Sequence, residues 1–313
     1  MDFEMPMSTI DNYQVPYGNG ENERMPEARF AELRQIRTRY FQLAPQSDAA
    51  TVLFIHGGIA FADSLAMSAT LWERNLGRIG SFARAYAYDV PGQSHPAIAT
   101  LDDVVEHARD FMHHIGGSRI HVVGHGDGGI VALKLALACV DRVRSVTVVG
   151  SNAAPLGDGV TDFTISDPPV PLESHDAQRW LTERISYSEH HLNVGRFLDD
   201  AVDVARRRSR AVHHQDSMSA AERRRMRASI ARARADLFSH CRVAGLPVPV
   251  MLVWGFQDPI VPFKHALALF NILSEKTPEV QLRFINRAGN MPFRERPDEF
   301  SAALAGFIGA LEH

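Results

Sequence analysis

The stretch that decides the fold is Ile120-His121-Val122-Val123-Gly124-His125-Gly126-Asp127-Gly128-Gly129. Its apolar first half predicts a buried strand, and its second half predicts a glycine-rich turn that leads into a helix. This is the setting of the nucleophile elbow, a G-x-S-x-G turn that exposes a serine at a strained corner between strand and helix. The apex of the turn is here Gly126. Because glycine has no side chain, this position supplies no nucleophile.

A second turn, near the C-terminus, departs from its expected residues in a similar way. Residues 284–292 have the form of a strand followed by a Gly-His-x-Pro turn that carries a general base, but Asn290 stands at the histidine position. An amide neither takes nor returns a proton near neutral pH. The sequence therefore predicts the scaffold for a nucleophile and a base without either group.

Strand and helix patterns alternate on both sides of the elbow. Strands are predicted at 30–36, 40–43, 51–55, 83–88, 120–123, 143–149, 248–255 and 280–285, and helices at 101–115, 130–140, 264–273 and 297–311. Such alternation predicts an α/β fold with a mostly parallel sheet and helices on both faces. The alternation stops between Ser151 and Arg242, where a proline-rich stretch leads into helical, arginine-rich sequence.

These changes in pattern predict a domain organisation. Residues 1–25 form a polar N-terminal arm, 26–151 and 243–313 form the α/β core, and 152–242 form a helical cap. No apolar leader and no membrane-spanning stretch is found in the sequence. The two cysteines have no metal-ligand spacing, and a buried reduced thiol is expected at Cys139.

Composition is that of an ordinary globular protein, with 45% hydrophobic and 22% charged residues. The net charge of −4 gives no general electrostatic reason to expect nucleic acid or a membrane surface as a partner. We therefore expect a cytoplasmic protein with a small-molecule substrate and no cofactor or metal, and a homodimer is left open.

Five motifs in order resemble those of the α/β-hydrolase family. They are the loop His56-Gly57-Gly58, the turn Asp89-Val90-Pro91-Gly92-Gln93-Ser94, the elbow Gly124–Gly129, the strand end Trp254-Gly255-Phe256-Gln257-Asp258 and the turn Gly289-Asn290-Met291-Pro292. Within the family, the chain looks most like the carbon–carbon bond hydrolases that cleave meta-cleavage products of aromatic catabolism. The resemblance implies an α/β-hydrolase fold with a helical cap, in which Asp258 keeps the triad acid while Gly126 and Asn290 replace the nucleophile and the base.

The resemblance also implies an oxyanion hole. Its backbone N–H groups are expected from Asp127 and from Gly58 or Ile59, in a loop that includes Gly57. Such donors stabilise negative charge on a carbonyl oxygen and contribute roughly 3–4 kcal/mol to lowering a barrier. This retained machinery predicts an enzyme that acts on a carbonyl-bearing small molecule by cyclisation, elimination, isomerisation or carbon–carbon bond chemistry.

Several alternatives stay open at this point. Asp127 is a nucleophile if the elbow is shifted by one residue, and otherwise begins the following helix. Asp258 is either a structural carboxylate or a base toward substrate or water, and Asn290 is either a substrate ligand or an amide that stabilises its turn. His125 is expected to pack below the elbow, and among the cap histidines His190, His191, His213 and His214 one could face the cleft. A protein that binds a small molecule or a protein without turnover is the second functional hypothesis, and residual hydrolysis with Asp127 or Asp258 activating water is the third.

Overall fold

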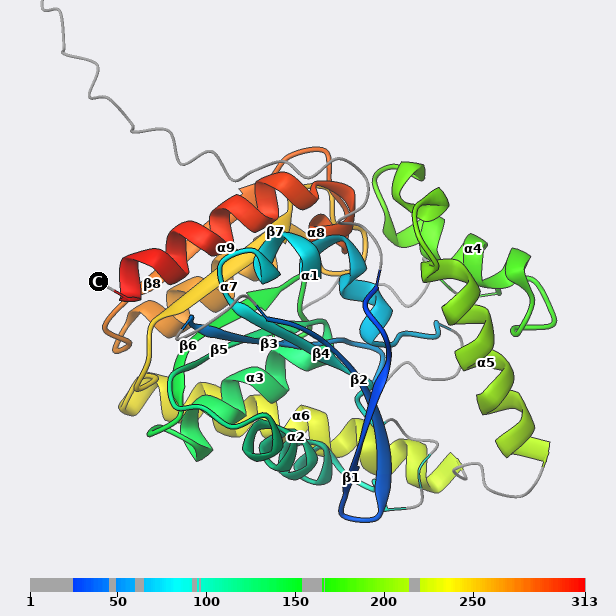
Figure 1. Ribbon diagram of the computed structural model, residues 1–313. Helices are drawn as coiled ribbons and strands as arrows, with labels where there is room; N and C mark the ends of the chain where they lie inside the picture. The colour runs from blue at the N-terminus through cyan, green and yellow to red at the C-terminus, as the bar shows by residue number, and fades with distance from the viewer. Residues whose placement is uncertain are drawn as a thin grey trace, which may run out of the picture.

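The computed structural model describes residues 25–44, 49–59, 65–91, 95, 97–153, 165, 167–213 and 220–312. Over these residues one eight-stranded sheet has the order β1-β2-β4-β3-β5-β6-β7-β8 (Figure 1). The strands are β1 (Arg29–Leu33), β2 (Ile36–Leu43), β3 (Thr51–Ile55), β4 (Arg84–Tyr88), β5 (Ile120–His125), β6 (Val143–Val149), β7 (Val250–Gly255) and β8 (Val280–Ile285). β2 pairs antiparallel with β1 and β4, and the other neighbours are parallel. The mostly parallel sheet is confirmed.

Helices cover both faces of this sheet. They are α1 (Glu73–Gly80), α2 (Leu101–Ile115), α3 (Asp127–Ala138), α4 (His175–Ile185), α5 (Phe197–His213), α6 (Ala220–Val243), α7 (Phe263–Ser274), α8 (Pro292–Glu295) and α9 (Pro297–Glu312), with short 3₁₀ helices η2 (Ala69–Trp72) and η4 (His190–Asn193). The larger apolar core lies between the sheet and α2, α3, α6 and α7. The second core lies on the opposite face, under α1, α8 and α9 (Figure 1). Every residue of β3, β5 and β7 is buried, as expected for parallel strands that are covered on both faces.

The structure agrees with most of the predicted elements and corrects a few. Strands 51–55, 143–149 and 280–285 and helix 101–115 have the predicted bounds. The first predicted strand is wrong at its end, because Arg34 and Gln35 take φ values of 48° and 65° and form the tight turn of a hairpin. Arg34-Gln35 lacks the Asn-Gly or Asp-Gly signal that such turns usually carry, so the sequence does not predict the turn. Helix α1 was not predicted either.

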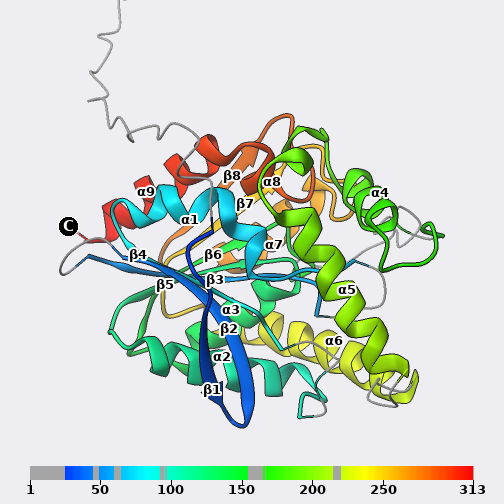
Figure 2. The ribbon, with the colours of Figure 1, turned by 45° about the vertical axis from the view of Figure 1, so that its right-hand side comes forward.

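The helices of the interval 152–242 separate into two groups. α4, η4 and α5 lie beside the carboxyl ends of the strands, on the right of Figure 1 and in front in Figure 2. α6 instead packs against α2, α3 and α7, and its residues Met226, Ile230, Ala233, Leu237 and Cys241 belong to the larger core. These contacts favour assigning α6 to the helical layer of the core, while the predicted domain boundaries remain predictions. Cys139 and Cys241 are buried and unpaired.

Candidate active site

The elbow between β5 and α3 is formed as the glycine pattern predicts. Gly126 has φ 56° and ψ −126°, a conformation that L side chains rarely adopt. A Cβ atom at Gly124 would lie 2.2 Å from the Gly128 carbonyl oxygen, and one at Gly128 would lie 2.6 Å from the Ile55 oxygen. A Cβ atom at Gly126 would approach only Gly57 Cα, at 3.4 Å, which is an ordinary contact. Close packing therefore requires glycine on either side of the apex but leaves room for a side chain at the apex itself.

The loop after β3 lies against the elbow. Gly58 has φ 83°, which a larger residue would adopt only under strain, and it lines the same pocket as Gly57, Gly126 and Asp127. Ile59 does not line this pocket, and its side chain is buried in the larger core. The structure thus brings together the backbone of Gly58 and of Asp127, the two places where the resemblance predicts oxyanion donors.

Asn290 occupies the position of the expected base and is fully engaged. Its Nδ2 donates to Asp258 Oδ2 at 2.9 Å and to the Gly150 carbonyl oxygen at 3.2 Å. Its Oδ1 lies 3.0 Å from His125 Nε2, and its backbone N–H donates to the Ile185 oxygen at 2.8 Å. The amide therefore contacts Asp258, Gly150 and His125, and both of its N–H groups donate to protein oxygens.

Asp258 lies behind Asn290. Its Oδ1 accepts hydrogen bonds from the backbone N–H groups of Ile260 and Val261, at 2.8 and 2.9 Å, and its Oδ2 accepts from Asn290. Burial raises the pKa of Asp258 to about 7, although these hydrogen bonds act in the opposite direction. The residue is 4% exposed and is not among the pocket-lining residues. A water in the pocket is consequently separated from this carboxyl group by Asn290.

His125 is the last residue of β5, directly before the elbow, and its ring contacts the oxygens of Asn290. Its ring packs edge-on against Trp72 and Phe293. Nε2 faces two acceptors, the Asn290 oxygens O and Oδ1 at 3.1 and 3.0 Å, so Nε2 carries the hydrogen. Burial lowers the pKa of His125 to about 4, which keeps the ring neutral at physiological pH. The polar chain runs from Asp258 through Asn290 to His125.

Asp127 is the first residue of α3 and is 2% exposed. Its Oδ1 accepts a hydrogen bond from Asn152 Nδ2. Since the left-handed residue of the turn is Gly126 and Asp127 already has helical backbone, the geometry gives no support to an elbow shifted by one residue.

The pocket has apolar walls over this polar floor. The pocket contains about 620 Å³ of empty space, which includes the space at its mouth that is open to solvent. The apolar lining residues are Leu65, Met67, Ile165, Ile185, Ile260 and Val261, and the remaining polar one is Asn152. Gly150 and Asn152 were missed by the sequence argument, although they follow a buried strand that neighbours the elbow strand. Met67, Ile165 and Ile185 carry no sequence signal. Ile165 and Ile185 reach the pocket through the path of the chain after β6, and Met67 through the segment between β3 and η2.

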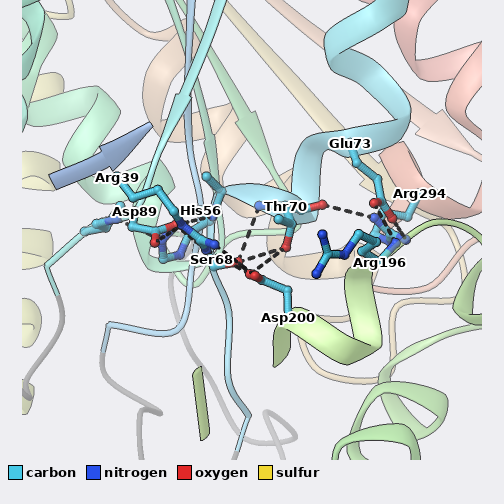
Figure 3. A network of polar contacts seen from close by, with 11 residues as sticks. Arg39, His56, Ser68, Thr70, Glu73, Asp89, Arg196, Asp200 and Arg294 are labelled. Atoms are coloured by element: carbon cyan, nitrogen blue, oxygen red, sulfur yellow. Dashed lines mark hydrogen bonds and ion pairs between the residues drawn. The ribbon is translucent and has the colours of Figure 1, made fainter. Parts of the chain in front are cut away.

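Two polar networks join the segment of α4, η4 and α5, called the cap segment below, to the core (Figure 3). In the first, Arg39 of β2 binds Asp200 of α5 in a two-pronged contact at 2.9 and 3.0 Å, and it also binds Asp89 at 2.8 Å. Ser68 and Thr70 donate to the same Asp200 oxygen. Burial alone would raise the pKa of Asp200, but the hydrogen bonds from Arg39 and Ser68 lower it overall, so this carboxylate stays charged.

The second network is centred on a completely buried ion pair. Arg294 Nη2 donates to Glu73 Oε1 at 2.9 Å, and the other Glu73 oxygen accepts from the backbone N–H of Arg196 at 3.0 Å (Figure 3). Arg294 also donates to the backbone oxygen of His191 at 3.3 Å, and its guanidinium lies over the Phe197 ring. The ion pair therefore joins α1 and α8 of the core to the segment that enters α5.

The cap histidines do not reach the pocket in the part of the chain that the structure describes. His191 is buried against Ser186 Oγ and beside Arg294, and burial lowers its pKa to about 2. His190 is exposed. The side chain of His213 and all of His214 lie outside the described residues, so their predicted role stays untested.

Residues 52–303 match the alpha/beta hydrolase family. The chain belongs to this family. The family resemblance that the five motifs carried is thereby confirmed, together with the fold.

Relatives within the family have varied activities. The chain is 28% identical over 316 residues to the dihydrolipoyllysine-residue acetyltransferase component of the acetoin cleaving system of Cupriavidus necator, with 98% of this chain and 77% of that protein covered. It is 22% identical over 271 residues to the 2-hydroxy-6-oxo-6-phenylhexa-2,4-dienoate hydrolase of Comamonas testosteroni, covering 83% and 88%. Both relatives are enzymes, and one of them is a hydrolase.

Solved structures support the same fold. A meta-cleavage product hydrolase variant from Pseudomonas fluorescens IP01 superposes with a TM-score of 0.62 at 19% identity, covering 91% of this chain and 98% of that one. A carboxylesterase from Bacillus subtilis superposes with a TM-score of 0.64 at 19% identity, covering 90% and 91%. Among the described residues, no cluster of three His, Cys, Asp or Glu side chains could bind a metal ion, and no helix has the length and apolarity to cross a membrane.

Proposed function

We propose that this α/β-hydrolase-fold chain is an enzyme that converts a carbonyl-bearing small molecule by a non-hydrolytic route. The reaction class is cyclisation, elimination, isomerisation or carbon–carbon bond chemistry. The backbone N–H groups at Gly58 and Asp127 stabilise the negative charge that develops on the carbonyl oxygen, and the substrate supplies its own nucleophile. No side chain at position 126 takes part.

One observation carries this proposal. The elbow keeps the strained conformation of a catalytic turn at Gly126, with room for a side chain, yet it presents none. Strained backbone of this kind tends to persist where it serves a function. The open pocket above the elbow is a further argument against a purely structural remnant.

The hydrolytic alternatives find less support. Asp258 has both oxygens in hydrogen bonds and lies outside the pocket lining, and Asp127 is held by Asn152. Neither carboxylate is therefore presented to a water or to a substrate carbon as a free nucleophile or base. The carbonyl substrate class agrees with the Comamonas relative, whose name specifies an oxo compound.

Product mass tests the proposal directly. The purified protein is incubated with a library of aldehydes, ketones, esters and lactones in isotopically labelled water, and the products are examined by mass spectrometry. We expect at least one compound to give a product of unchanged mass, or of lower mass after elimination, with no labelled oxygen beyond the carbonyl exchange seen in a sample without protein. A product formed by addition of water, with labelled oxygen in excess of that exchange, or a covalent ester on Asp127, would overturn the proposal. Binding without any conversion would favour the ligand-binding hypothesis instead.

A second measurement concerns the absent nucleophile. Because Gly126 presents no side chain, we expect no covalent labelling by fluorophosphonate probes and no burst with p-nitrophenyl esters. Stoichiometric labelling at or beside the elbow would contradict this expectation.

A further inference from the structure

We infer that Asn152 selects substrates that carry a hydroxyl or N–H donor in addition to their carbonyl group. The inference rests on the proposed function in one respect, because it takes the pocket at Gly126 as the substrate site. It adds the chemical class of the substrate, which the retained elbow and loop do not specify.

The orientation of the Asn152 amide is set by its neighbour. Asn152 Nδ2 donates to Asp127 Oδ1, and Asp127 is almost completely buried. An ionised carboxylate accepts hydrogen bonds but donates none, so the NH₂ end of the amide must face Asp127. The Oδ1 end of the amide therefore faces away from Asp127.

Helix α6 helps to fix the position of Asn152. Arg234 of α6 donates from Nη1 to the backbone oxygen of Asn152 at 3.2 Å. Burial lowers the pKa of Arg234, and the nearby negative charge of Asp127 acts in the opposite direction. Contacts from α3 and α6 thus hold Asn152 in place at the end of β6, where it lines the pocket.

The acceptor end of this amide is unsatisfied. Asn152 Oδ1 is buried and has no hydrogen-bond partner in the part of the chain that the structure describes. Buried polar atoms almost always have a partner, and leaving one unpaired is unfavourable. A ligand hydroxyl or N–H group in the pocket would supply the missing donor.

A second pocket-lining residue shows the same deficit. Because Nε2 of His125 carries the hydrogen toward Asn290, Nδ1 is a lone-pair acceptor, and it too is buried with no partner among the described residues. The side chains around the pocket therefore offer acceptors, while the backbone of Gly58 and Asp127 is placed to offer donors to a carbonyl oxygen. Hydroxy ketones, hydroxy esters and amides combine the two complementary groups.

A matched pair of ligands tests the inference. α-Hydroxyacetophenone and α-methoxyacetophenone share the carbonyl group and a neighbouring oxygen, but only the first donates a hydrogen bond. Binding is followed through the NMR signal of the Met67 methyl group, which lines the pocket. We expect the hydroxy compound to bind about tenfold more tightly to the natural chain, a ratio that corresponds to about 1.4 kcal/mol.

Two variants assign the preference to Asn152. In Asn152→Leu the ratio should fall to about one. In Asp127→Asn the ratio should also fall. An amide at position 127 can donate as well as accept, so the Asn152 side chain is retained but its amide is free to rotate by 180°. Asn271→Leu, at an exposed position on α7, serves as the matched control and should keep the tenfold ratio.

Equal binding of the two ketones to the natural chain, a preference that survives in both variants, or no shift of the Met67 signal with either ketone would overturn the inference. The measurement involves no turnover. Equal binding consequently leaves the proposed function to be decided by product mass.

Discussion

At the scale of single residues, position 126 differs from the other glycines of its turn. Gly124 and Gly128 are required because backbone atoms lie where a side chain would be, whereas a Cβ atom at Gly126 would make only an ordinary contact, at 3.4 Å from Gly57 Cα. Packing therefore does not explain why position 126 lacks a nucleophilic side chain. The same holds for Asn290, whose amide keeps a contact with Asp258 that a histidine could also make.

This geometry predicts that esterase activity can be installed. In the double variant Gly126→Ser with Asn290→His, the serine has room at the apex and the new histidine lies beside Asp258. We expect hydrolysis of p-nitrophenyl acetate at least about 10²-fold above the natural chain, since a triad adds to the residual effect of the oxyanion donors. Initial rates measured by absorbance report the outcome.

The single variants and a third substitution are the controls. Gly126→Ser alone should gain little, because no base is present, and Asp258→Asn should remove most of the gain of the double variant. A double variant that folds normally but hydrolyses no faster than the natural chain would show that the two loops are not in catalytic register.

The loop after β3 can be tested in the same background. Gly58→Val places a branched residue at φ 83°, where a Cβ atom would lie 3.2 Å from Met67 Cβ, so the loop must shift. Displacing an oxyanion donor should lower the kcat of the installed esterase by about 10²-fold or more. Gly306→Val, where a Cβ atom meets no atom within 4 Å, is the matched control and should leave kcat unchanged. An equal effect of the two substitutions would contradict a role for the loop.

At the scale of elements, two ion-pair networks join the cap segment to the core. The Arg39 network ties α5 to β2 and to the turn after β4, and the Arg294 network ties the entrance of α5 to α1 and α8 (Figure 3). The pocket lies between these two parts of the chain, since Ile185 of α4 and Met67 of the core line it together. Cap position and pocket shape are therefore linked through one partly buried and one fully buried group of charges.

The buried pair predicts a large effect on stability. Arg294→Met leaves Glu73 without its charge partner in a fully buried site, and we expect the free energy of unfolding to fall by about 3–5 kcal/mol. Urea unfolding followed by circular dichroism measures the change. The double variant Glu73→Leu with Arg294→Met should recover a part of it, because no unpaired charge remains. A loss below about 1 kcal/mol in the single variant would contradict the assignment.

At the scale of the whole molecule, buried histidines make the fold sensitive to acid. Burial lowers the pKa of His107, His121 and His125 to about 4, and that of His191 to about 2. The folded chain binds these protons more weakly than the unfolded chain, in which the pKa is near 6.5, so stability is lost as pH falls below about 6.5. Asp258 and Glu295 act in the opposite sense, because burial raises their pKa values to about 7 and the folded state keeps protons that the unfolded state releases.

We therefore expect a net loss of stability between about pH 7 and pH 5, with His107 as the clearest contributor. Its Nε2 pairs with Thr38 Oγ1 at 2.8 Å, a contact that Gln can retain. His107→Gln should make the loss roughly 2 kcal/mol smaller at about pH 5 than in the natural chain. Urea unfolding at several pH values provides the comparison, and parallel profiles for the two chains would rule out this contribution.

Much of the fold followed from local sequence. Apolar runs such as 51–55 and 143–149 are strands because both of their faces are covered, and the Gly124–Gly129 turn can be recognised because backbone contacts exclude other residues. The family motifs predict a common site for Gly57, Gly58, Gly126, Asp127 and Asn290, and all five line one pocket. These features depend on close neighbours in the chain, or on parallel strands whose carboxyl ends meet at one edge of the sheet.

Other features were decided by the tertiary structure alone. Whether Asp258 faces the pocket or lies behind Asn290 depends on hydrogen bonds between loops more than 30 residues apart. The alignment of His125 with Asn290, the unsatisfied oxygen of Asn152 and the packing of α6 against the core helices also depend on distant segments. Sequence patterns report which residues prefer burial and which backbone turns are allowed. The partner of a buried polar atom is decided only when separate elements pack together, because the cost of an unpaired atom is set by all of its neighbours at once.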